Sequence, residues 1–261
     1  YVFKGTEHYN ARQIINHIEG IGGEINAYTT KEETTFYAAT LCNHFRTTLH
    51  LLADMVLRPT FNKKETDKEV TVILDEIESY NDSPSELIYD DFENMVFEGS
   101  SLAMPILGTK KTLRRISKSP EIALNWMKTH YRPERNVSTK QVISSAEREL
   151  GEVPHISSLS SHSSLSSHSS MPSATTRTYK RHTHQTHIML GSHAYPIGHP
   201  KQLTMYLLNN IMGGGSMSSR LYLSLREKHG LVYNIDSQAV PLSDTGYWNI
   251  YLACEPQHKD Q

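Results

Sequence analysis

The 261-residue sequence contains little that would place it in a membrane, in a disulfide framework or on a polyanion. No run of about 18 apolar residues occurs, so no membrane-spanning segment is predicted. The two cysteines, Cys42 and Cys254, are too far apart for a C-x-x-C metal site, and we expect two reduced, partly buried thiols. A formal net charge of −2 gives no overall field that would attract nucleic acid or a membrane surface. What remains is a composition typical of a globular chain with a real core.

The first half of the chain carries the signals of a helix, a β-hairpin and further helices. Asn10–Glu19 has a helical apolar stripe ended by glycines, and two strand patterns follow it with a polar turn between them. Helix-start signals then recur at Asn62, with Glu65 as a candidate capping-box partner, and at two Ser-Pro pairs. The expected elements are helices over 10–19, 45–56, 62–80, from 84 and 122–129, and strands over 24–29 and 34–41.

The second half begins after a tract of unusual composition. Ser157–Ser170 reads SSLSSHSSLSSHSS, which has too little apolar surface to fold and is predicted to be a flexible linker. Strand and helix patterns resume afterwards, over 182–191, 201–212, 218–228, 231–240 and 247–254. The order of elements predicts an α+β protein of two related domains, each a mostly antiparallel sheet packed with helices. We expect domains at 1–154 and 177–261, the second incomplete, joined by a Ser/His-rich linker at 155–176.

Two carboxylates of the 62–80 helix are candidates for chemistry. Glu69 and Glu76 are seven residues apart, so both lie on one helical face, with Ile73 between them. A carboxylate on a partly apolar stripe needs a cation, a metal or strong donors as a partner. Taken alone, however, the spacing favours a solvated acidic face, because this helix carries many acidic residues.

Three segments give the pair its context. They are VFKGT at Val2–Thr6, GGEINAYTTKEETTFYAA at Gly22–Ala39 and EVTVILDEI at Glu69–Ile77. Together they resemble the N-terminal domain of the pitrilysin/insulinase-like (inverzincin) zinc metallopeptidases, a family that includes the mitochondrial processing peptidases. The resemblance implies a zinc endopeptidase that binds its peptide substrate as an added strand.

Within the resemblance, Glu76 stands at the place of the carboxylate that completes the zinc site, and Glu69 at that of a supporting carboxylate. The edge that binds substrate corresponds to Asn26, Ala27 and Tyr28. The family's H-x-x-E-H motif, which supplies two zinc ligands and the general base, would precede Tyr1 and is absent here. We therefore expect an N-terminally truncated fragment whose zinc site is incomplete and which is inactive as it stands.

A second region carries an independent resemblance. LYLSLREKHGLVYNI at Leu221–Ile235 is similar to the family's second-domain motif, in which an arginine and a tyrosine seven residues apart reach the substrate and the reaction centre. Arg226 and Tyr233 have that spacing, and a fixed cation with a phenol donor suits an oxyanion. Gly213–Gly215 resembles the family's glycine-rich loop. Without this context, an exposed helix arginine and a strand tyrosine would be the simpler interpretation.

The chain departs from the family pattern in its middle. After Asn136-Val137 the family has a further strand of its first domain, whereas here the Ser138–Leu150 stretch leads into the Ser/His tract. The histidines of RHTHQTH (His182, His184 and His187) have no nearby carboxylate or cysteine to complete a metal site, so a plain strand is the preferred interpretation. His162 and His168 are interpreted as linker residues in preference to loose metal ligands.

Two functions follow from these observations. The first is a zinc-dependent metalloendopeptidase acting on peptides or unfolded proteins, here a fragment without the histidine pair. The second is a non-catalytic partner or scaffold subunit of a heterodimeric family member. In either case we expect pairing with a second family chain as a homodimer or heterodimer, and neither a nucleic-acid partner nor a membrane span.

Overall fold

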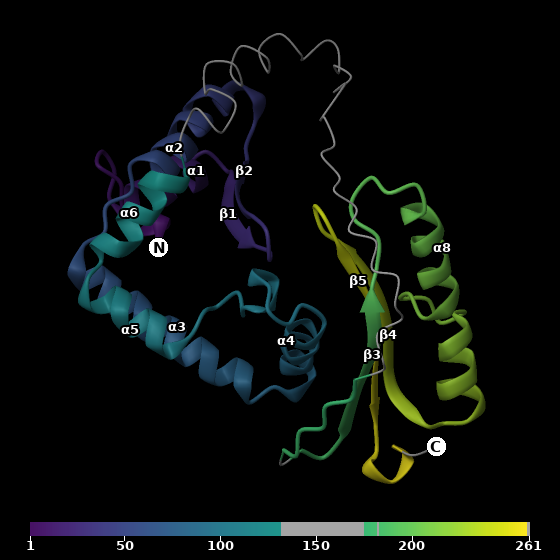
Figure 1. Ribbon diagram of the computed structural model, residues 1–261. Helices are drawn as coiled ribbons and strands as arrows, with labels where there is room; N and C mark the ends of the chain where they lie inside the picture. Colours follow the sequence, from purple (N-terminus) through teal and green to yellow (C-terminus); the bar gives the residue numbers. More distant parts are fainter. Residues whose placement is uncertain (132–174, 182, 260–261) are drawn as a thin grey trace. The chain divides into compact units, whose positions relative to one another are not determined.

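The computed structural model describes residues 1–131, 175–181 and 183–259 (Figure 1). These residues form two compact units, which are described separately below. The first contains residues 1–78 and 105–131, and the second contains 79–104 with the described residues from 175 onward. The expected linker at Ser157–Ser170 and the stretch Ser138–Leu150 lie outside the described residues. In the part of the chain that is described, no helix is both long and apolar enough to cross a membrane.

The first unit is a β-hairpin packed with helices. Strands β1 and β2 pair antiparallel, with Tyr28 opposite Thr35 and Thr29 opposite Thr34. The elements of this unit are α1 (Ala11–Glu19), β1 (Glu24–Thr29), β2 (Thr34–Ala39), α2 (Phe45–Leu57), α3 (Lys63–Asn81, whose last three residues belong to the second unit), α5 (Lys110–Lys118) and α6 (Glu121–His130), with short 3-10 turns at Val2–Lys4 and Cys42–His44.

Local sequence signals explain where α1 begins, where it ends and how β1 follows it. Asn10 and Gln13 form a capping box, each side chain bonding the other's backbone N–H. Gly22 then adopts a positive φ of 75°, and Gly23 approaches Ile18 and Ala39 so closely that a Cβ there would clash with both. The chain can therefore reverse direction and enter β1 directly against α1.

A compact apolar cluster holds this unit together. Ile14 and Ile18 of α1 are 0% and 1% exposed, and they pack with Leu51 and Met55 of α2 and with Met127 of α6. Burying an aliphatic side chain of this size contributes roughly 1.5–3 kcal/mol. Ile14 and Ile18 of the stripe predicted for the 10–19 helix thus form the core face of α1, whereas Ile15 is 40% exposed.

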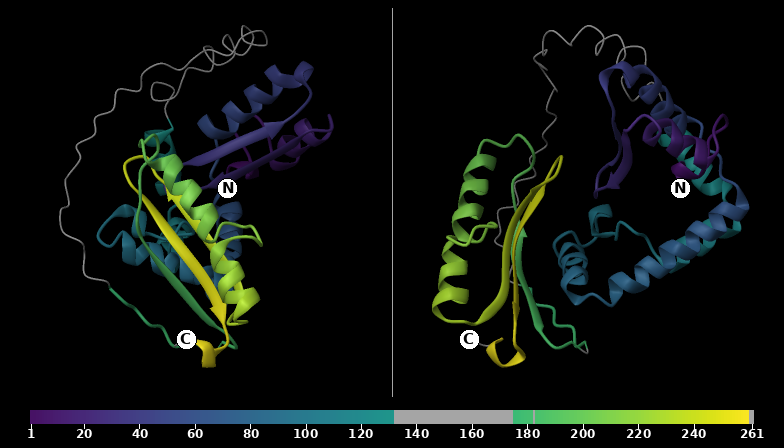
Figure 2. Two further views of the ribbon diagram at one scale, coloured as in Figure 1. Left: turned by 90° about the vertical axis from the view of Figure 1, so that its right-hand side faces the viewer. Right: turned by 180° about the vertical axis from the view of Figure 1, so that it is seen from behind.

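The second unit is built on a three-stranded antiparallel sheet of order β3-β5-β4 (Figure 2). Helix α8 lies along one face of this sheet, and α4 packs against β3. The elements are α4 (Pro84–Val96), a short turn at Ser101–Ala103, β3 (Thr186–His193), α8 (Gln202–Met212), a π-helical segment η4 (Tyr222–Lys228), β4 (Val232–Pro241), β5 (Gly246–Cys254) and a turn at Pro256–His258.

Successive side chains of β5 point to opposite faces of the sheet and pack against different helices. Tyr247 and Phe97 belong to one apolar cluster with Phe92 of α4, and Tyr247 donates a buried 2.6 Å hydrogen bond to Glu93 of the same helix. Gly191 of β3 gives α4 its close approach, because a Cβ there would lie 2.6 Å from the Phe92 ring. Trp248, next along β5, is on the other face and bonds Asn209 of α8.

The structure confirms the α+β class and the antiparallel sheets, and it corrects several details. The strand expected over 182–191 begins only at Thr186, and His182 lies outside the described residues. The predicted 218–228 helix is π-helical over most of its length, and helix α5 was not predicted at all. Cys42 is exposed rather than partly buried, whereas Cys254 is buried.

Candidate functional site

The two α3 carboxylates have different surroundings. Glu69 is largely buried, with its side chain 22% exposed, and forms a 3.0 Å ion pair with Lys4 from the segment Val2–Thr6. Glu76 is exposed. The cation that the sequence argument required for Glu69 is therefore a lysine of the neighbouring motif, whereas Glu76 keeps a solvated carboxylate.

These residues do not supply a zinc site by themselves. Across residues 1–131, 175–181 and 183–259, no group of three His, Cys, Asp or Glu side chains is placed to hold a metal ion. A catalytic zinc site normally needs three protein ligands and a water molecule. Glu76 offers one such ligand, and the described residues do not place two more beside it, so the described donor set does not fit the ion.

Strand β1 has a backbone edge that no other described strand of its unit pairs with. The two-stranded sheet of described residues leaves the side of β1 away from β2 unpaired. Thr30 donates its N–H to Glu33 C=O at 2.8 Å, which fixes the alternation of the hairpin. Tyr28 and Asn26 consequently direct their backbone groups toward β2, and Ala27 directs its N–H and C=O outward.

Asn26 makes a contact that follows from this alternation. Its side-chain Oδ1 accepts the Ala27 N–H at 2.8 Å, so the outward donor at the centre of the edge is bonded by its own neighbour. Asn26 and Tyr28 are both exposed, with Tyr28 at 51% and tilted against Tyr37 of β2. Of the three residues predicted to bind substrate, Ala27 thus has its backbone groups at the outer edge, and Asn26 and Tyr28 flank it with exposed side chains.

Arg226 and Tyr233 lie in different cavities of the second unit. Arg226, on η4, stacks over the Tyr222 ring with its guanidinium carbon 5.0 Å from the ring centre. It lines a cavity of about 480 Å³ together with the glycine-rich loop. Residues of α4, β4 and β5 also line it: Ser85, Tyr89, Asn234, Ile235, Asp236 and Tyr251.

The Arg226 cavity carries both signs of charge. Asp236 lines the same cavity as Arg226, and no ion pair joins the two. Burial, followed by the charge of Asp236, raises the pKa of Tyr89 to about 12. Its hydroxyl therefore stays protonated at neutral pH. The cavity can offer a ligand one cation, one anion and a phenol donor.

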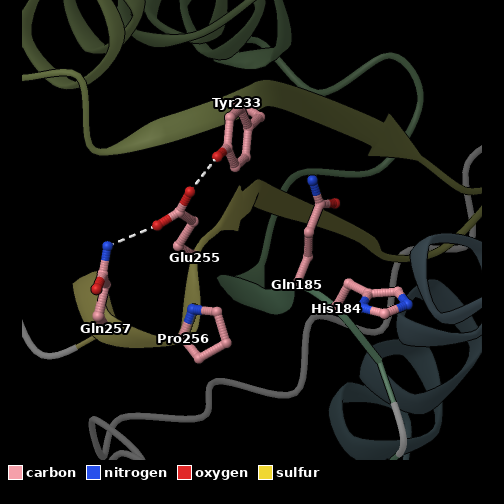
Figure 3. Close-up of a pocket in the computed structure, with 6 residues that line it drawn as sticks. All are labelled: His184, Gln185, Tyr233, Glu255, Pro256 and Gln257. Atoms are coloured by element: carbon pink, nitrogen blue, oxygen red, sulfur yellow. Dashed lines mark hydrogen bonds between the residues drawn. The ribbon is translucent and has the colours of Figure 1, made fainter.

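Tyr233 is directed elsewhere by a β-bulge. The register of β4 against β5 shifts between Val232 and Asn234, which leaves Tyr233 as the extra residue. Bulges of this kind re-aim a side chain. The Tyr233 hydroxyl donates a short hydrogen bond to Glu255, just beyond β5 (Figure 3).

Glu255 is held from both sides in a second cavity of about 450 Å³. Its other carboxylate oxygen accepts from Gln257 Nε2 at 2.6 Å. His184 and Gln185, immediately ahead of β3, complete the lining with Pro256 (Figure 3). The hydrogen bond to Glu255, more than burial, raises the pKa of Tyr233, which keeps its single phenolic proton on the oxygen.

Sequence reasoning found Arg226 and Tyr233 but not the groups that hold them. Glu255 is 22 residues from Tyr233, and only the pairing of β4 with β5 brings the two together. Tyr222 is four residues before Arg226, a helical spacing that would have suggested the stacking contact. Of the RHTHQTH histidines, His187 lies in β3 and its ring stacks on Tyr251.

Comparison with known proteins agrees with this architecture. Residues 1–110 match the family model described as Insulinase (Peptidase family M16), and residues 119–261 match the model described as Peptidase M16 inactive domain. The chain is 34% identical over 256 residues to YmxG of Bacillus subtilis, named an uncharacterized zinc protease, and 35% identical over 258 residues to an uncharacterized zinc protease of Rickettsia felis. These alignments cover 95% and 96% of this chain but only 60% and 61% of the relatives.

More distant likenesses extend the comparison. The beta subunit of the mitochondrial-processing peptidase of Bos taurus is 26% identical over 271 residues, covering 97% of this chain and 54% of the subunit. A protease structure from Helicobacter pylori superposes with a TM-score of 0.78 at 17% identity, over 98% of this chain and 63% of that one, and shares the fold.

The fold and the matched regions thus define an insulinase-type α+β protein. The chain belongs to peptidase family M16. The two relatives from Bacillus subtilis and Rickettsia felis are named zinc proteases.

Proposed function

We propose that this chain is part of a zinc-dependent endopeptidase and that its own residues bind a peptide as an extended strand along β1. The edge of β1 that no described strand covers is the observation that carries this proposal. Main-chain hydrogen bonds to such an edge give affinity that depends little on peptide sequence, as a peptidase for unfolded segments requires. Family membership supports the direction of the proposal, since its relatives are named zinc proteases.

Two groups of the second unit have the chemistry to act on a reacting carbonyl. Arg226 offers a cation fixed on the Tyr222 ring, and Tyr233 offers a phenol that is protonated at neutral pH. Donors aimed at a developing oxyanion lower the barrier because that charge forms only in the transition state. Since the two residues line separate cavities, Tyr233 would have to leave Glu255 before it could donate beside Arg226. Toward a zinc ion this chain offers Glu76, and the other ligands would have to come from outside the described residues.

Peptide binding to the chain itself tests the proposal. A soluble ten-residue extended peptide should bind in isothermal titration, and the same peptide N-methylated at two adjacent residues should bind about tenfold more weakly, because strand pairing loses its donors. Ala27→Pro should abolish binding without unfolding the chain, because proline is tolerated at an edge position that does not bond the neighbouring strand. Equal binding of both peptides would refute strand pairing.

Hydrolysis tests the catalytic half of the proposal. A version extended by an H-x-x-E-H helix ahead of Tyr1 should cleave the peptide in the presence of zinc, and Glu76→Gln should remove that activity. The chain without the extension should leave the peptide intact.

The second candidate is a non-catalytic partner subunit. It is favoured by the lack, among the residues described, of three side chains placed to hold a metal. It predicts that the extended version binds peptide and still fails to cleave it, while addition of an active family member yields a complex that does.

A further inference from the structure

Helix α5 has a charge pattern unlike the rest of the chain. Its nine residues, KKTLRRISK, include five cations and no acidic residue, although the whole chain has a net charge of −2. One of the five, Lys110, forms a 2.5 Å ion pair with Glu78 of α3. The other four are exposed, and no ion pair joins them to any described residue: Lys111, Arg114, Arg115 and Lys118.

The helix places these four cations on one side. Helix α5 lies beside α3 (Figure 1). Leu113 is buried at 8% exposure and marks the inner face. Ser117 donates a 2.7 Å hydrogen bond to Asp67 and marks, with Lys110, the side toward α3. At about 100° per residue the four free cations fall within roughly 100° of arc on the side away from Leu113. Lys111 and Lys118, at the two ends of the set, are seven positions apart, or about 10 Å along the helix. This set is called the α5 basic face below.

The α5 basic face is unfavourable for the helix that carries it. Like charges three and four residues apart, such as Lys111 with Arg115 and Arg114 with Lys118, repel one another on a helix. Lysines in the first turn also oppose the helix dipole. The helix is maintained instead by its Thr109 N-cap, whose side chain accepts the Thr112 N–H at 3.2 Å, and by burial of Leu113. Among the described residues of this unit, no ion pair offsets the repulsion, so the face is suited to a partner of opposite charge.

We propose that the α5 basic face binds an acidic peptide segment of another protein. Arginine and lysine match carboxylates in charge, and arginine can engage them through two parallel hydrogen bonds. About 10 Å of helix corresponds to three residues of an extended peptide. This binding does not depend on the proposed peptidase function, because it uses a different face and no residue of β1 or of the Arg226 cavity.

Other anionic partners fit the face less well. Insertion into a lipid surface requires exposed apolar side chains beside the charges. In α5, Leu113 is buried and Ile116 is half-buried. Nucleic-acid binding relies on a basic domain, whereas this chain has an isoelectric point near 6.8. An acidic protein segment needs only the local patch.

Fluorescence anisotropy with labelled hexaglutamate, and hexaglutamine as its uncharged match, tests the proposal. Hexaglutamate should bind the intact chain at low salt and lose affinity near 1 M salt, where charges are screened within about 3 Å. Replacing all four cations of the α5 basic face by glutamine should weaken binding by at least about tenfold. The double variants K111Q/K118Q and R114Q/R115Q should each weaken it partially, which preserves the test if the quadruple variant does not fold.

A charge-matched control separates the patch from net charge. Replacing four exposed cations elsewhere by glutamine lowers the formal charge equally and should leave binding within about twofold: Arg12, Lys64, Lys201 and Lys259. An equal loss in that control, no binding of hexaglutamate, or tighter binding of duplex DNA or phosphatidylserine vesicles through the same four residues would each overturn the proposal.

Discussion

Replacement of Asn209 by alanine should destabilise the second unit by about 2–4 kcal/mol. Asn209 is 7% exposed on α8 and lies against the sheet. Its Nδ2 donates to Ser237 C=O at 2.9 Å, and its Oδ1 accepts from Ser237 Oγ at 2.6 Å and from Trp248 Nε1 at 3.1 Å. The network links α8 to β4 and β5 beside the cavity that Arg226 lines.

The magnitude follows from which groups keep a partner in the variant. Trp248 Nε1 can still donate to Ser237 Oγ, and that hydroxyl can still donate to Asn249 C=O, both at 3.1 Å. The Ser237 carbonyl loses the donor that it had. One orphaned buried acceptor costs roughly 1–3 kcal/mol, and the lost net hydrogen bonding adds about 1 kcal/mol. Asn209→Asp should cost at least as much, because it directs a carboxylate at that carbonyl.

Urea unfolding measures this cost. Fluorescence of Trp248, recorded in a Trp126→Phe background, reports the second unit, and circular dichroism reports the whole chain. The adjacent Asn210→Ala is the matched control: it has the same chemistry on an exposed position of the same helix and should change stability by less than about 0.5 kcal/mol. If Asn209→Ala costs no more than Asn210→Ala, the network does not hold α8 to the sheet and the reasoning fails.

Three further results are expected. Glu255→Gln should lower the pKa of Tyr233 toward its ordinary value, because the acceptor loses its charge. Ultraviolet titration of tyrosinate, with Tyr233→Phe as the reference, measures this pKa. An unchanged titration would exclude the pairing. Burial lowers the pKa of His187, so the unfolded chain binds the proton more tightly than the folded chain does. Stability should therefore fall as the pH drops below about 6.5. His187→Phe, which can still stack on Tyr251, should reduce that loss in thermal melts at pH 7 and pH 5. Asn26→Ala should speed hydrogen exchange of the Ala27 amide, because that N–H loses its acceptor. The same change should strengthen extended-peptide binding by about two- to tenfold, since the Ala27 N–H becomes available to the peptide. Unchanged exchange would show that the Asn26 side chain does not bond the Ala27 N–H.

Local sequence signals predicted most of the elements. The apolar stripe of α1 and the glycines after Glu19 act over a few residues, and the structure has the helix they predict, with Asn10 as its N-cap instead of its first helical residue. Asn62 does bond near the start of α3, to Lys64 N–H at 2.9 Å, although Glu65 pairs with Lys68. Helix α5 was missed because only Leu113 and Ile116 are apolar in it, too few for a periodic pattern; Thr109 was the available start signal.

The sequence by itself determined the fold class, the family resemblance and the candidate residues, because motifs and periodicities are local properties of the chain. Only the tertiary structure decided their partners: Lys4 for Glu69, Glu255 for Tyr233 and Asn209 for Ser237. Each of these contacts joins residues more than 20 positions apart. Such contacts depend on strand register, on a bulge and on helix docking, and these are set by packing of the whole unit and not by any short segment.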